Sequence, residues 1–472
     1  MEFRNIVPLI VSVCFLSCVL SCDGNPLEPT RPPFTSKDLR DRGGETAAQL
    51  AASLNDPSVM DCGVAPIENI AAFPREYLDG YILGVDLSSI IEVESLGGAF
   101  YDIDRYRVGD VIELFSYYGI NWIRMRLWNE PFTAEGASYG GGGNDIQTAL
   151  AIGRRAKKWG MKILLDFHYS DFWAHPGQQA RPKDWVQYLT ADALAPVFKN
   201  WTKGVLYAMN GEGGFLPDMV QIGNETVAGF CGFHDDGPLA TTKPNEKKLL
   251  AAGLEAVREI SEECDYPILT MLHAANDMVT IDRYIGIVQD LDFDVIGFSY
   301  YPDSYGNRAD FEAGLQNLAN KYQKPICLAE YQVPFTGKSA YDGSFYNDSN
   351  ANTASFIDTG ASRTVSGQAQ IIRNMNNAIM NNTVSGGVRY GIGSFWWEAA
   401  WLPLDGTGWK SANSNEWYRM NLPGKPAITE DWLDYPARVG CADKGFFSFN
   451  GTALPSLNAF LQMMGKDPRP NS

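Results

Sequence analysis

The sequence predicts an α/β fold, a (β/α)8 TIM barrel, and three observations support this prediction. Eight apolar runs rich in β-forming residues follow one another between residues 81 and 398. Helix-compatible segments lie between most of them, as expected for a parallel sheet built from βα units. Polar residues gather at the C-terminal ends of the runs, which form the active face of such a barrel. A doubly wound open sheet is the alternative, but it usually has fewer strands and a Gly-rich first turn, which the first run lacks.

The predicted strands span 81–88, 120–128, 162–169, 219–225, 268–275, 293–301, 325–332 and 391–398. Helical patterns cover 145–159, 196–209, 246–263, 308–321 and 361–380. The glycine run 140–143 has no strand directly before it and no G-K-[ST] after it, which argues against a phosphate-binding loop. We expect it to deliver Asn144 or Asp145 as the N-cap of the helix at 145–159.

Chemically active side chains mark the ends of the predicted strands, where a barrel positions catalytic groups. Period-two alternation places Arg124, Arg126 and Trp128 on one face of the second strand. A barrel interior does not need so many polar groups for packing alone. The predicted site residues at strand ends are Asp86, Arg124, Arg126, Asp166, His168, Asn224, Glu225, His273, Tyr301, Glu330 and Trp397.

Two strands end on a glutamate, Glu225 after M-V-Q-I-G-N and Glu330 after P-I-C-L-A. Two facing carboxyl groups are the minimum equipment for hydrolysis of a glycosidic bond. The alternative is that both are ordinary ion-pair partners at strand ends. His168 and His273 also have a second interpretation, as core histidines that the backbone satisfies. Trp396 and Trp401 are open between core and sugar-binding roles, because aromatic side chains serve both.

Composition restricts the partners. With 38 Lys and Arg against 56 Asp and Glu the net charge is −18, and no basic block is present. Nucleic acid and anionic membrane surfaces are therefore excluded as partners, because phosphate binding needs clustered Lys and Arg. A polyanionic substrate is disfavoured for the same reason. A neutral glycan fits, and the 12 Trp, 22 Tyr and 24 Phe can supply aromatic faces for sugar rings.

The N-terminus resembles an export signal. Arg4 precedes an apolar segment, 6–20, that is short for a transmembrane helix, and Val19-Leu20-Ser21-Cys22 resembles a bacterial lipoprotein box. We expect a signal peptide over residues 1–22 with lipidation at Cys22, a tether and N-terminal extension over 23–76, and a catalytic domain over 77–466. The chain is then an outer-membrane lipoprotein that meets the membrane only through its lipid anchor. An ordinary secretory signal and a secreted protein are the alternative.

Five cysteines follow Cys22, and none of them forms a C-x-x-C pair, which argues against a zinc site. Cys327 lies inside a predicted strand and is expected to be a buried free thiol. Cys62 and Cys441 flank the predicted domain, and their pairing is left open, as are the states of Cys231 and Cys264.

The ordered set of motifs resembles glycoside hydrolase family 53, the endo-β-1,4-galactanases of the retaining clan A. The resemblance extends from about residue 81 to residue 460. Its carriers are G-V-D-L-S-S (84–89), W-I-R-M-R-L-W-N-E-P (122–131), G-G-G-G-N-D (140–145), D-F-H-Y-S-D-F-W-A-H-P-G-Q-Q (166–179), Q-I-G-N-E (221–225), G-F-S-Y-Y-P (297–302), A-E-Y (329–331) and W-W-E-A-A-W (396–401).

The resemblance implies retaining endo-hydrolysis of β-1,4-galactosidic bonds in galactan and type I arabinogalactan. Glu225 is then the general acid/base and Glu330 the nucleophile, with carboxyl groups roughly 5 Å apart. It further implies that Asn224 binds the 2-OH of the reacting sugar and that an arginine of the second strand and Tyr301 orient Glu330. Trp397 is the expected floor of the neighbouring subsite, and Asp166, His168 and Trp173 are expected to bind adjacent sugars.

Two positions depart from the family pattern, and both affect subsites. His175 replaces the usual aspartate in W-A-H-P-G, and Ala399 replaces proline in W-E-A-A-W. No cofactor is expected. A structural calcium occurs in some relatives, but the loop 336–352 lacks the dense acidic ladder that calcium needs, so no metal is predicted. The alternatives are a clan A endo-glycanase acting on mannan, xylan or β-glucan, and a surface glycan-binding lipoprotein without catalysis.

Overall fold

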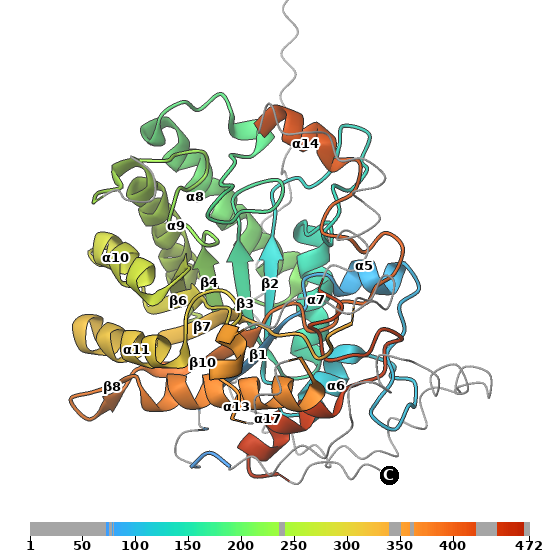
Figure 1. Cartoon of the computed structure of the whole chain (residues 1–472). Helices are drawn as coiled ribbons and strands as arrows, with labels where there is room; N and C mark the ends of the chain where they lie inside the picture. The colour runs from blue at the N-terminus through green and yellow to red at the C-terminus, as the bar shows by residue number, and fades with distance from the viewer. Residues whose placement is uncertain are drawn as a thin grey trace, which may run out of the picture. The chain divides into compact units, whose positions relative to one another are not determined.

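The computed structural model describes residues 72–74, 78, 80–235, 241–338, 351–358, 363–421 and 441–466. Within these residues, eight strands close into a parallel barrel in the order β1-β10-β7-β6-β5-β4-β3-β2, which confirms the predicted (β/α)8 TIM barrel (Figure 1). The strands are β1 (Ile82–Asp86), β2 (Trp122–Leu127), β3 (Lys162–Phe167), β4 (Met219–Ile222), β5 (Leu269–Ala275), β6 (Val295–Ser299), β7 (Ile326–Tyr331) and β10 (Gly391–Trp396). A small hairpin of β8 (Val384–Ser385) and β9 (Val388–Arg389) precedes the last strand.

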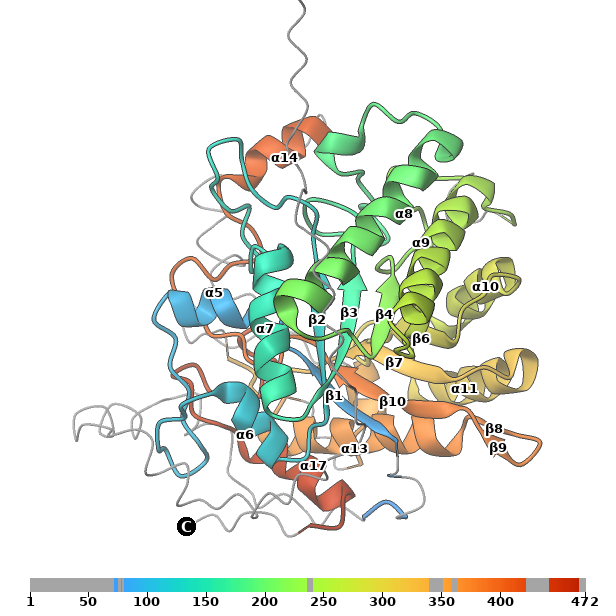
Figure 2. The ribbon, with the colours of Figure 1, turned by 180° about the vertical axis from the view of Figure 1, so that it is seen from behind.

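Helices surround the barrel (Figure 2). They are α5 (Ile90–Ser95), α6 (Val111–Tyr117), α7 (Ile146–Lys158), α8 (Ala191–Ala208), α9 (Pro244–Glu263), α10 (Met278–Val288), α11 (Arg308–Tyr322), α12 (Ala351–Ser355), α13 (Val365–Asn381), α14 (Ser414–Asn421) and α17 (Asn458–Met463). The five predicted helices are present as α7, α8, α9, α11 and α13. Asp145 caps α7 by accepting a hydrogen bond from the Thr148 N–H, as expected.

Helix α8 begins earlier than predicted, and α10 is one of six described helices that were not predicted, with α5, α6, α12, α14 and α17. Thr190 caps α8 through the Ala193 N–H, so the helix begins five residues before Pro196. The α10 sequence is rich in β-branched residues, which have a weak intrinsic preference for helix. The Asp277 side chain supplies its N-cap, and packing against the barrel stabilises its buried face.

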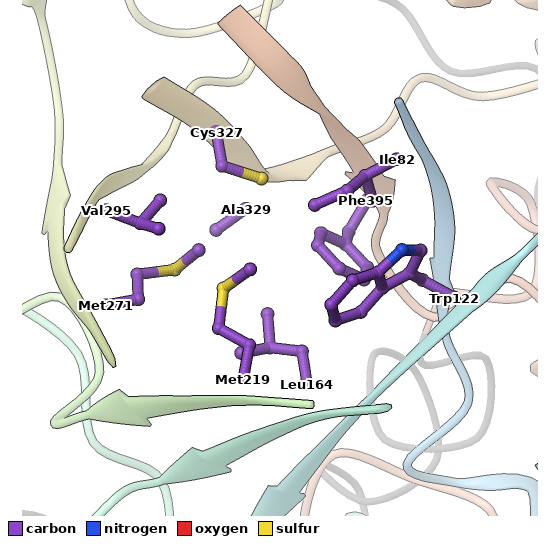
Figure 3. Close-up of a cluster of buried hydrophobic side chains, with 9 residues drawn as sticks. All are labelled: Ile82, Trp122, Leu164, Met219, Met271, Val295, Cys327, Ala329 and Phe395. Carbon is purple, nitrogen blue, oxygen red and sulfur yellow. The ribbon is translucent and has the colours of Figure 1, made fainter. Parts of the chain in front are cut away.

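One side chain or more from every barrel strand fills the interior below the active face (Figure 3). This layer consists of Ile82, Trp122, Leu164, Met219, Met271, Val295, Cys327, Ala329 and Phe395. Cys327 is fully buried within it as a free thiol, as predicted. Two residues further along β2 and β3, the same alternation places Arg124 and Asp166 directly above this layer.

The apolar layer therefore supports a polar one. The polar side chains need partners at this depth, since a buried charge without one is costly.

Several barrel strands end earlier than predicted, because the chain leaves the sheet through residues in the left-handed region. Tyr169, Glu225 and Glu398 have φ angles of 50°, 51° and 47°. Such conformations are uncommon for residues with a side chain and concentrate at functional sites. The residues that follow each strand are thus turned into the barrel mouth instead of continuing the strand.

Several predictions concern residues outside the described ranges. These are the signal segment with Cys22, most of the tether, Cys62, and the part of the calcium-candidate loop beyond residue 338. Phe73, which the predicted tether includes, is buried and donates its backbone N–H to the carbonyl of Met463. Cys441 is a buried free thiol 3.6 Å from Nε2 of Gln332. None of the helices described is both long and apolar enough to span a membrane.

Candidate active site

A cleft of about 490 Å³ opens at the C-terminal mouth of the barrel. Nine predicted site residues line it: Arg124, Arg126, His168, Trp173, Asn224, Glu225, Tyr301, Glu330 and Trp397. They come from the ends of six strands that are far apart in the sequence. The barrel thus brings together most of the residues that the sequence singled out.

Arg124 is the centre of the polar layer. Its guanidinium contacts three buried carboxylates, Asp86 at 2.9 Å, Asp166 at 2.7 Å and Glu330 at 2.7 Å. It also donates to Oδ1 of Asn224 at 3.0 Å. Arginine suits this position, because its rigid fork of donors can serve several acceptors at once and keeps its charge when buried. One cation therefore fixes the positions of groups from four strands.

Three predicted substrate-binding residues lie below the cleft instead of lining it. Asp86, Asp166 and His273 are fully buried and belong to the layer around Arg124. Asp166 accepts hydrogen bonds from Arg124, from Nε2 of Gln221 at 2.6 Å and from Nε2 of His168 at 3.1 Å. Their prediction as sugar ligands is corrected: they hold the residues above them.

Glu330 owes its inward orientation to a bulge. In the pairing of β6 with β7, Phe298 lies opposite Leu328 and Ser299 opposite Glu330, so Ala329 is the extra residue. A β-bulge re-aims the side chain that follows it. Strict alternation would have put Glu330 on the face opposite to Ala329, which belongs to the interior layer.

Glu330 has two partners that favour its ionised form, although burial raises its pKa overall. Burial raises the pKa of this carboxyl, while the Arg124 guanidinium and a hydrogen bond from Tyr301 oppose that effect. The Tyr301 hydroxyl lies 2.8 Å from Oε2 of Glu330. Burial and the charge of Glu330 raise the pKa of Tyr301 well above its ordinary value, so this hydroxyl keeps its proton and donates it. Glu330 is thus a held, oriented carboxylate.

Glu225 has the opposite character. Burial, and then the neighbouring charge of Glu330, raise its pKa to about 8, against smaller lowering effects of a Ser299 hydrogen bond and of Arg124. Arg124 forms a salt bridge with Glu330. Among the described residues, no Lys or Arg forms a salt bridge with Glu225. At neutral pH Glu225 therefore carries a proton. Two neighbouring carboxyls in such unequal surroundings suit the roles of an acid and a nucleophile.

His273 and Ser299 connect to Glu225 from below. The backbone N–H of Glu225 and the amide of Gln221 both donate to Nδ1 of His273, at 3.2 and 2.9 Å. Burial lowers the pKa of His273 well below its ordinary value, so the ring is neutral, and the two N–H donors at Nδ1 assign its proton to Nε2. That Nε2–H donates to Oγ of Ser299 at 3.1 Å, which leaves the Ser299 hydroxyl proton for Glu225.

His168 lines the cleft, but the protein engages both of its nitrogens. Nδ1 accepts hydrogen bonds from Trp128 Nε1 and from the Ala174 N–H, both at 3.1 Å. Nε2 then carries the proton and donates it to Asp166. Its nitrogens are thus used for positioning, and only the ring faces the cleft.

An aromatic wall forms one side of the cleft. Trp397 stacks on Trp409 with ring centroids 5.1 Å apart and an interplanar angle of 22°. Trp173 donates its Nε1–H to the carbonyl of Trp409 at 2.7 Å, and the Arg126 guanidinium lies over its ring at 4.3 Å. Trp396 and Trp401, left open by the sequence, are fully buried core residues.

Several residues that line the cleft come from segments away from the strand ends and were not predicted from the sequence. Trp409, Lys410 and Tyr418 come from the segment after β10, and Tyr305 from the segment after β6. No strand end marks them. The aromatic density of W-W-E-A-A-W and of the following segment is the one signal that could have drawn attention to Trp409.

A second buried pair supports the glycine run. Arg126 forms a salt bridge with Glu398 and donates to the carbonyl of Gly141. Gly142 donates its N–H to Glu92 at 2.8 Å. All four glycines at 140–143 have positive φ, so the run needs glycine to wrap around this arginine. Its role is structural and places Arg126 against Trp173.

The metal prediction concerns mainly residues that the structure does not describe. In the described part of the chain, no group of three or more His, Cys, Asp and Glu side chains is arranged to hold a metal ion. The carboxylates Asp86 and Asp166 of the polar layer share Arg124 as an ion-pair partner.

Comparisons with known proteins identify the family of the chain. The profile described as Glycosyl hydrolase family 53 matches residues 82–460. An endo-beta-1,4-galactanase of Bacillus subtilis (strain 168) is 34% identical over 400 residues, which cover 80% of this chain and 85% of the relative. An arabinogalactan endo-beta-1,4-galactanase of Cellvibrio japonicus (strain Ueda107) is 29% identical and covers 76% of this chain and 92% of its own length.

The solved structure of the Ignisphaera aggregans GH53 catalytic domain superposes with a TM-score of 0.66 at 32% identity, and covers 84% of this chain and 99% of that domain. The profile match includes the strands that precede Glu225 and carry Glu330. The chain belongs to glycosyl hydrolase family 53.

Proposed function

We propose that this protein is a retaining endo-β-1,4-galactanase that acts on galactan and type I arabinogalactan. The observation that carries the proposal is the pair of buried carboxyl groups in unequal surroundings, Glu330 held by Arg124 and Tyr301, and Glu225 with a pKa raised to about 8. The named relatives that are endo-β-1,4-galactanases supply the substrate class. No cofactor takes part in the proposed reaction.

The proposed reaction has two steps. In the first, an oxygen of Glu330 attacks the anomeric carbon, Glu225 gives its proton to the glycosidic oxygen, and the C1–O bond breaks. The leaving chain departs with a free hydroxyl, and a galactosyl ester on Glu330 remains. In the second, Glu225 takes a proton from water as the water oxygen attacks C1, and the Glu330 carboxylate leaves. Asn224, held by Arg124 and by the carbonyl of Ala174, is positioned to bind the 2-OH of the reacting sugar.

The pH profile tests the assignment of Glu225. Activity is expected to fall as pH rises through about 8, because the acid must carry its proton. Ser299→Ala removes a hydrogen bond that lowers the pKa of Glu225, so the alkaline limb of kcat/KM should move to higher pH. Ser394→Ala removes an equally buried hydroxyl on β10, which bonds to Asn376, and should leave the limb in place. A limb that moves to lower pH in Ser299→Ala contradicts the assignment.

The substrate is tested by a product time course on linear β-1,4-galactan, with mannan, xylan and β-glucan in parallel. Short galacto-oligosaccharides that appear early from galactan alone support endo-hydrolysis of this polymer. Hydrolysis of another glycan alone supports the alternative of a different clan A activity. Absence of hydrolysis of all four supports a glycan-binding protein without catalysis.

We further propose that the chain is exported and lipidated at Cys22, in the V-L-S-C sequence, with 23–76 as tether and N-terminal extension and 77–466 as the catalytic domain. Mass spectrometry of the protein purified from bacterial membranes should find a lipid-modified Cys22 at the mature N-terminus. Cys22→Ala should release the protein from the membrane fraction, whereas the control Cys18→Ala should not. Wild type found only in the soluble fraction supports the alternative of a secreted protein.

A further inference from the structure

A second hollow lies on the same face of the barrel, between the N-terminal ends of α10 and α11. Its volume is about 700 Å³. It is lined by the residues after β5, by the segment after β6 and by the first turns of α11, including Asn276, Val279, Ser304, Tyr305, Ala313 and Asn317. Tyr305 also lines the catalytic cleft. The two hollows therefore meet at one side chain.

Tyr305 lines the cleft together with Glu225 and Glu330. Burial raises the pKa of its hydroxyl, and the charges of Glu225 and then Glu330 add to that effect. Its ring lies 5.9 Å from the ring of Tyr301, the donor to Glu330. The groove thus begins where the glycosidic bond is cleaved.

The position of the groove in the barrel fixes which part of the substrate it faces. In the strand order, β5 and β6 lie between β4, which carries Glu225, and β7, which carries Glu330. The aromatic wall of Trp173, Trp397 and Trp409 comes from the segments after β3 and β10, outside this arc. When the sugar that Glu330 attacks rests on Trp397, the part of the polysaccharide beyond the cleaved bond lies over the side of the barrel formed by β5 and β6.

The lining of the groove suits a neutral, hydroxyl-rich ligand. Its carboxylates already have partners in the protein: Asp277 caps α10, Asp282 pairs with Lys321, and Asp310 accepts from Nδ2 of Asn307. The side chain of Val279 is 78% exposed and offers an apolar contact. Asn276 is exposed, with a left-handed φ of 96°, a conformation that concentrates at functional sites.

We propose that this groove binds the galactosyl residues on the leaving-group side of the cleaved bond. The proposal rests on the proposed galactanase function and adds where the departing chain lies. A chain bound there extends the contact with polymer beyond the cleft and contributes binding energy that small substrates do not provide.

The test blocks the groove without touching the cleft. Ala313 is exposed on α11, and Ala313→Trp places an indole in the hollow. We expect kcat/KM for linear β-1,4-galactan to fall by about 10-fold, because remote contacts with the leaving chain are lost. The kcat/KM for an aryl β-galactobioside, whose leaving group is one aromatic ring, should stay at the wild-type value. Ala251→Trp, on the exposed face of α9, is the matched control and should change neither.

Three results overturn the proposal. The first is an unchanged kcat/KM for galactan in Ala313→Trp. The second is an equal loss on galactan and on the aryl glycoside, which indicates damage to the cleft. The third is a wild-type enzyme that does not hydrolyse galactan. This result is seen before any variant is measured. It contradicts the proposed function, and with it the groove proposal. Val279→Ser, which adds no bulk, should raise KM for galactan in the same selective way.

Discussion

Replacement of Glu330 by alanine is expected to reduce kcat on linear galactan by roughly 10⁴-fold or more, the scale of loss seen when a member of a catalytic unit is removed. No covalent intermediate can form without this carboxylate. Among the described residues that line the cleft, only Glu330 is held by both Arg124 and Tyr301, so no other group there is placed to take over the attack. Initial rates of reducing-end release from galactan measure the loss.

Glu246→Gln is the matched control for Glu330→Ala. Glu246 is just as buried and pairs with Lys243, but it lies on α9 and does not line the cleft. Its replacement should leave kcat close to the wild-type value. Added azide should restore part of the activity of Glu330→Ala and yield an α-galactosyl azide, because a small anion can attack from the vacated side. Full activity of Glu330→Ala contradicts its assignment as nucleophile.

Arg124→Lys is expected to have the second largest effect, on both stability and activity. A lysine ammonium is a point charge and lacks the fork that serves Asp86, Asp166 and Glu330 together. A buried carboxylate left without its partner costs about 3–5 kcal/mol in the free energy of unfolding. Denaturant titration measures this loss. In the same variant a lysine that pairs with Asp86 or Asp166 no longer contacts Glu330 as well, so the effect of burial on the pKa of Glu330 is less opposed and the acid limb of kcat should move to higher pH.

Arg258→Lys is the control for the effect of replacing the forked donors of an arginine by a lysine ammonium at a partly exposed position. Arg258 also contacts two carboxylates, Asp292 and Asp294, but its side chain is 30% exposed. A surface pair of this kind contributes about 0–1 kcal/mol, so this variant should unfold close to wild type. Equal destabilisation by the two substitutions contradicts the central role of the buried Arg124 cluster.

The succession of strands and the position of the two glutamates at strand ends could be predicted, because both depend on local patterns. Apolar runs of strand length, with a polar residue at each end, occur in the sequence whether or not the fold is known. The family motifs placed Glu225 and Glu330 at the ends of the fourth and seventh strands; in the structure Glu225 follows β4, which ends at Ile222, and Glu330 lies within β7.

How deep each strand-end side chain lies below the cleft could not be predicted from the sequence. Asp86, Asp166 and His273 occur at strand ends like the cleft residues, yet they are fully buried around Arg124. The difference depends on the tilt and register of neighbouring strands. The bulge at Ala329 could not be predicted either, because it is defined only by the pairing of β7 with β6.

Residues in irregular segments were also outside the reach of the sequence. Trp409 reaches the cleft because the segment after β10 folds back onto Trp173 and Trp397. Tyr305 does so from the turn before α11. Neither position lies in a periodic element, so no pattern assigned a face to its side chain.

The central claim is that Glu330 attacks the anomeric carbon of a galactosyl unit. Its most direct test uses a 2-deoxy-2-fluoro-β-galactobiosyl fluoride, which forms the glycosyl ester but hydrolyses slowly, because the 2-fluoro group destabilises the oxocarbenium-like transition state. Peptide mass mapping after inactivation is predicted to find one galactobiosyl label, on the peptide that contains Glu330. A label on Glu225, or on any other residue, would contradict the account.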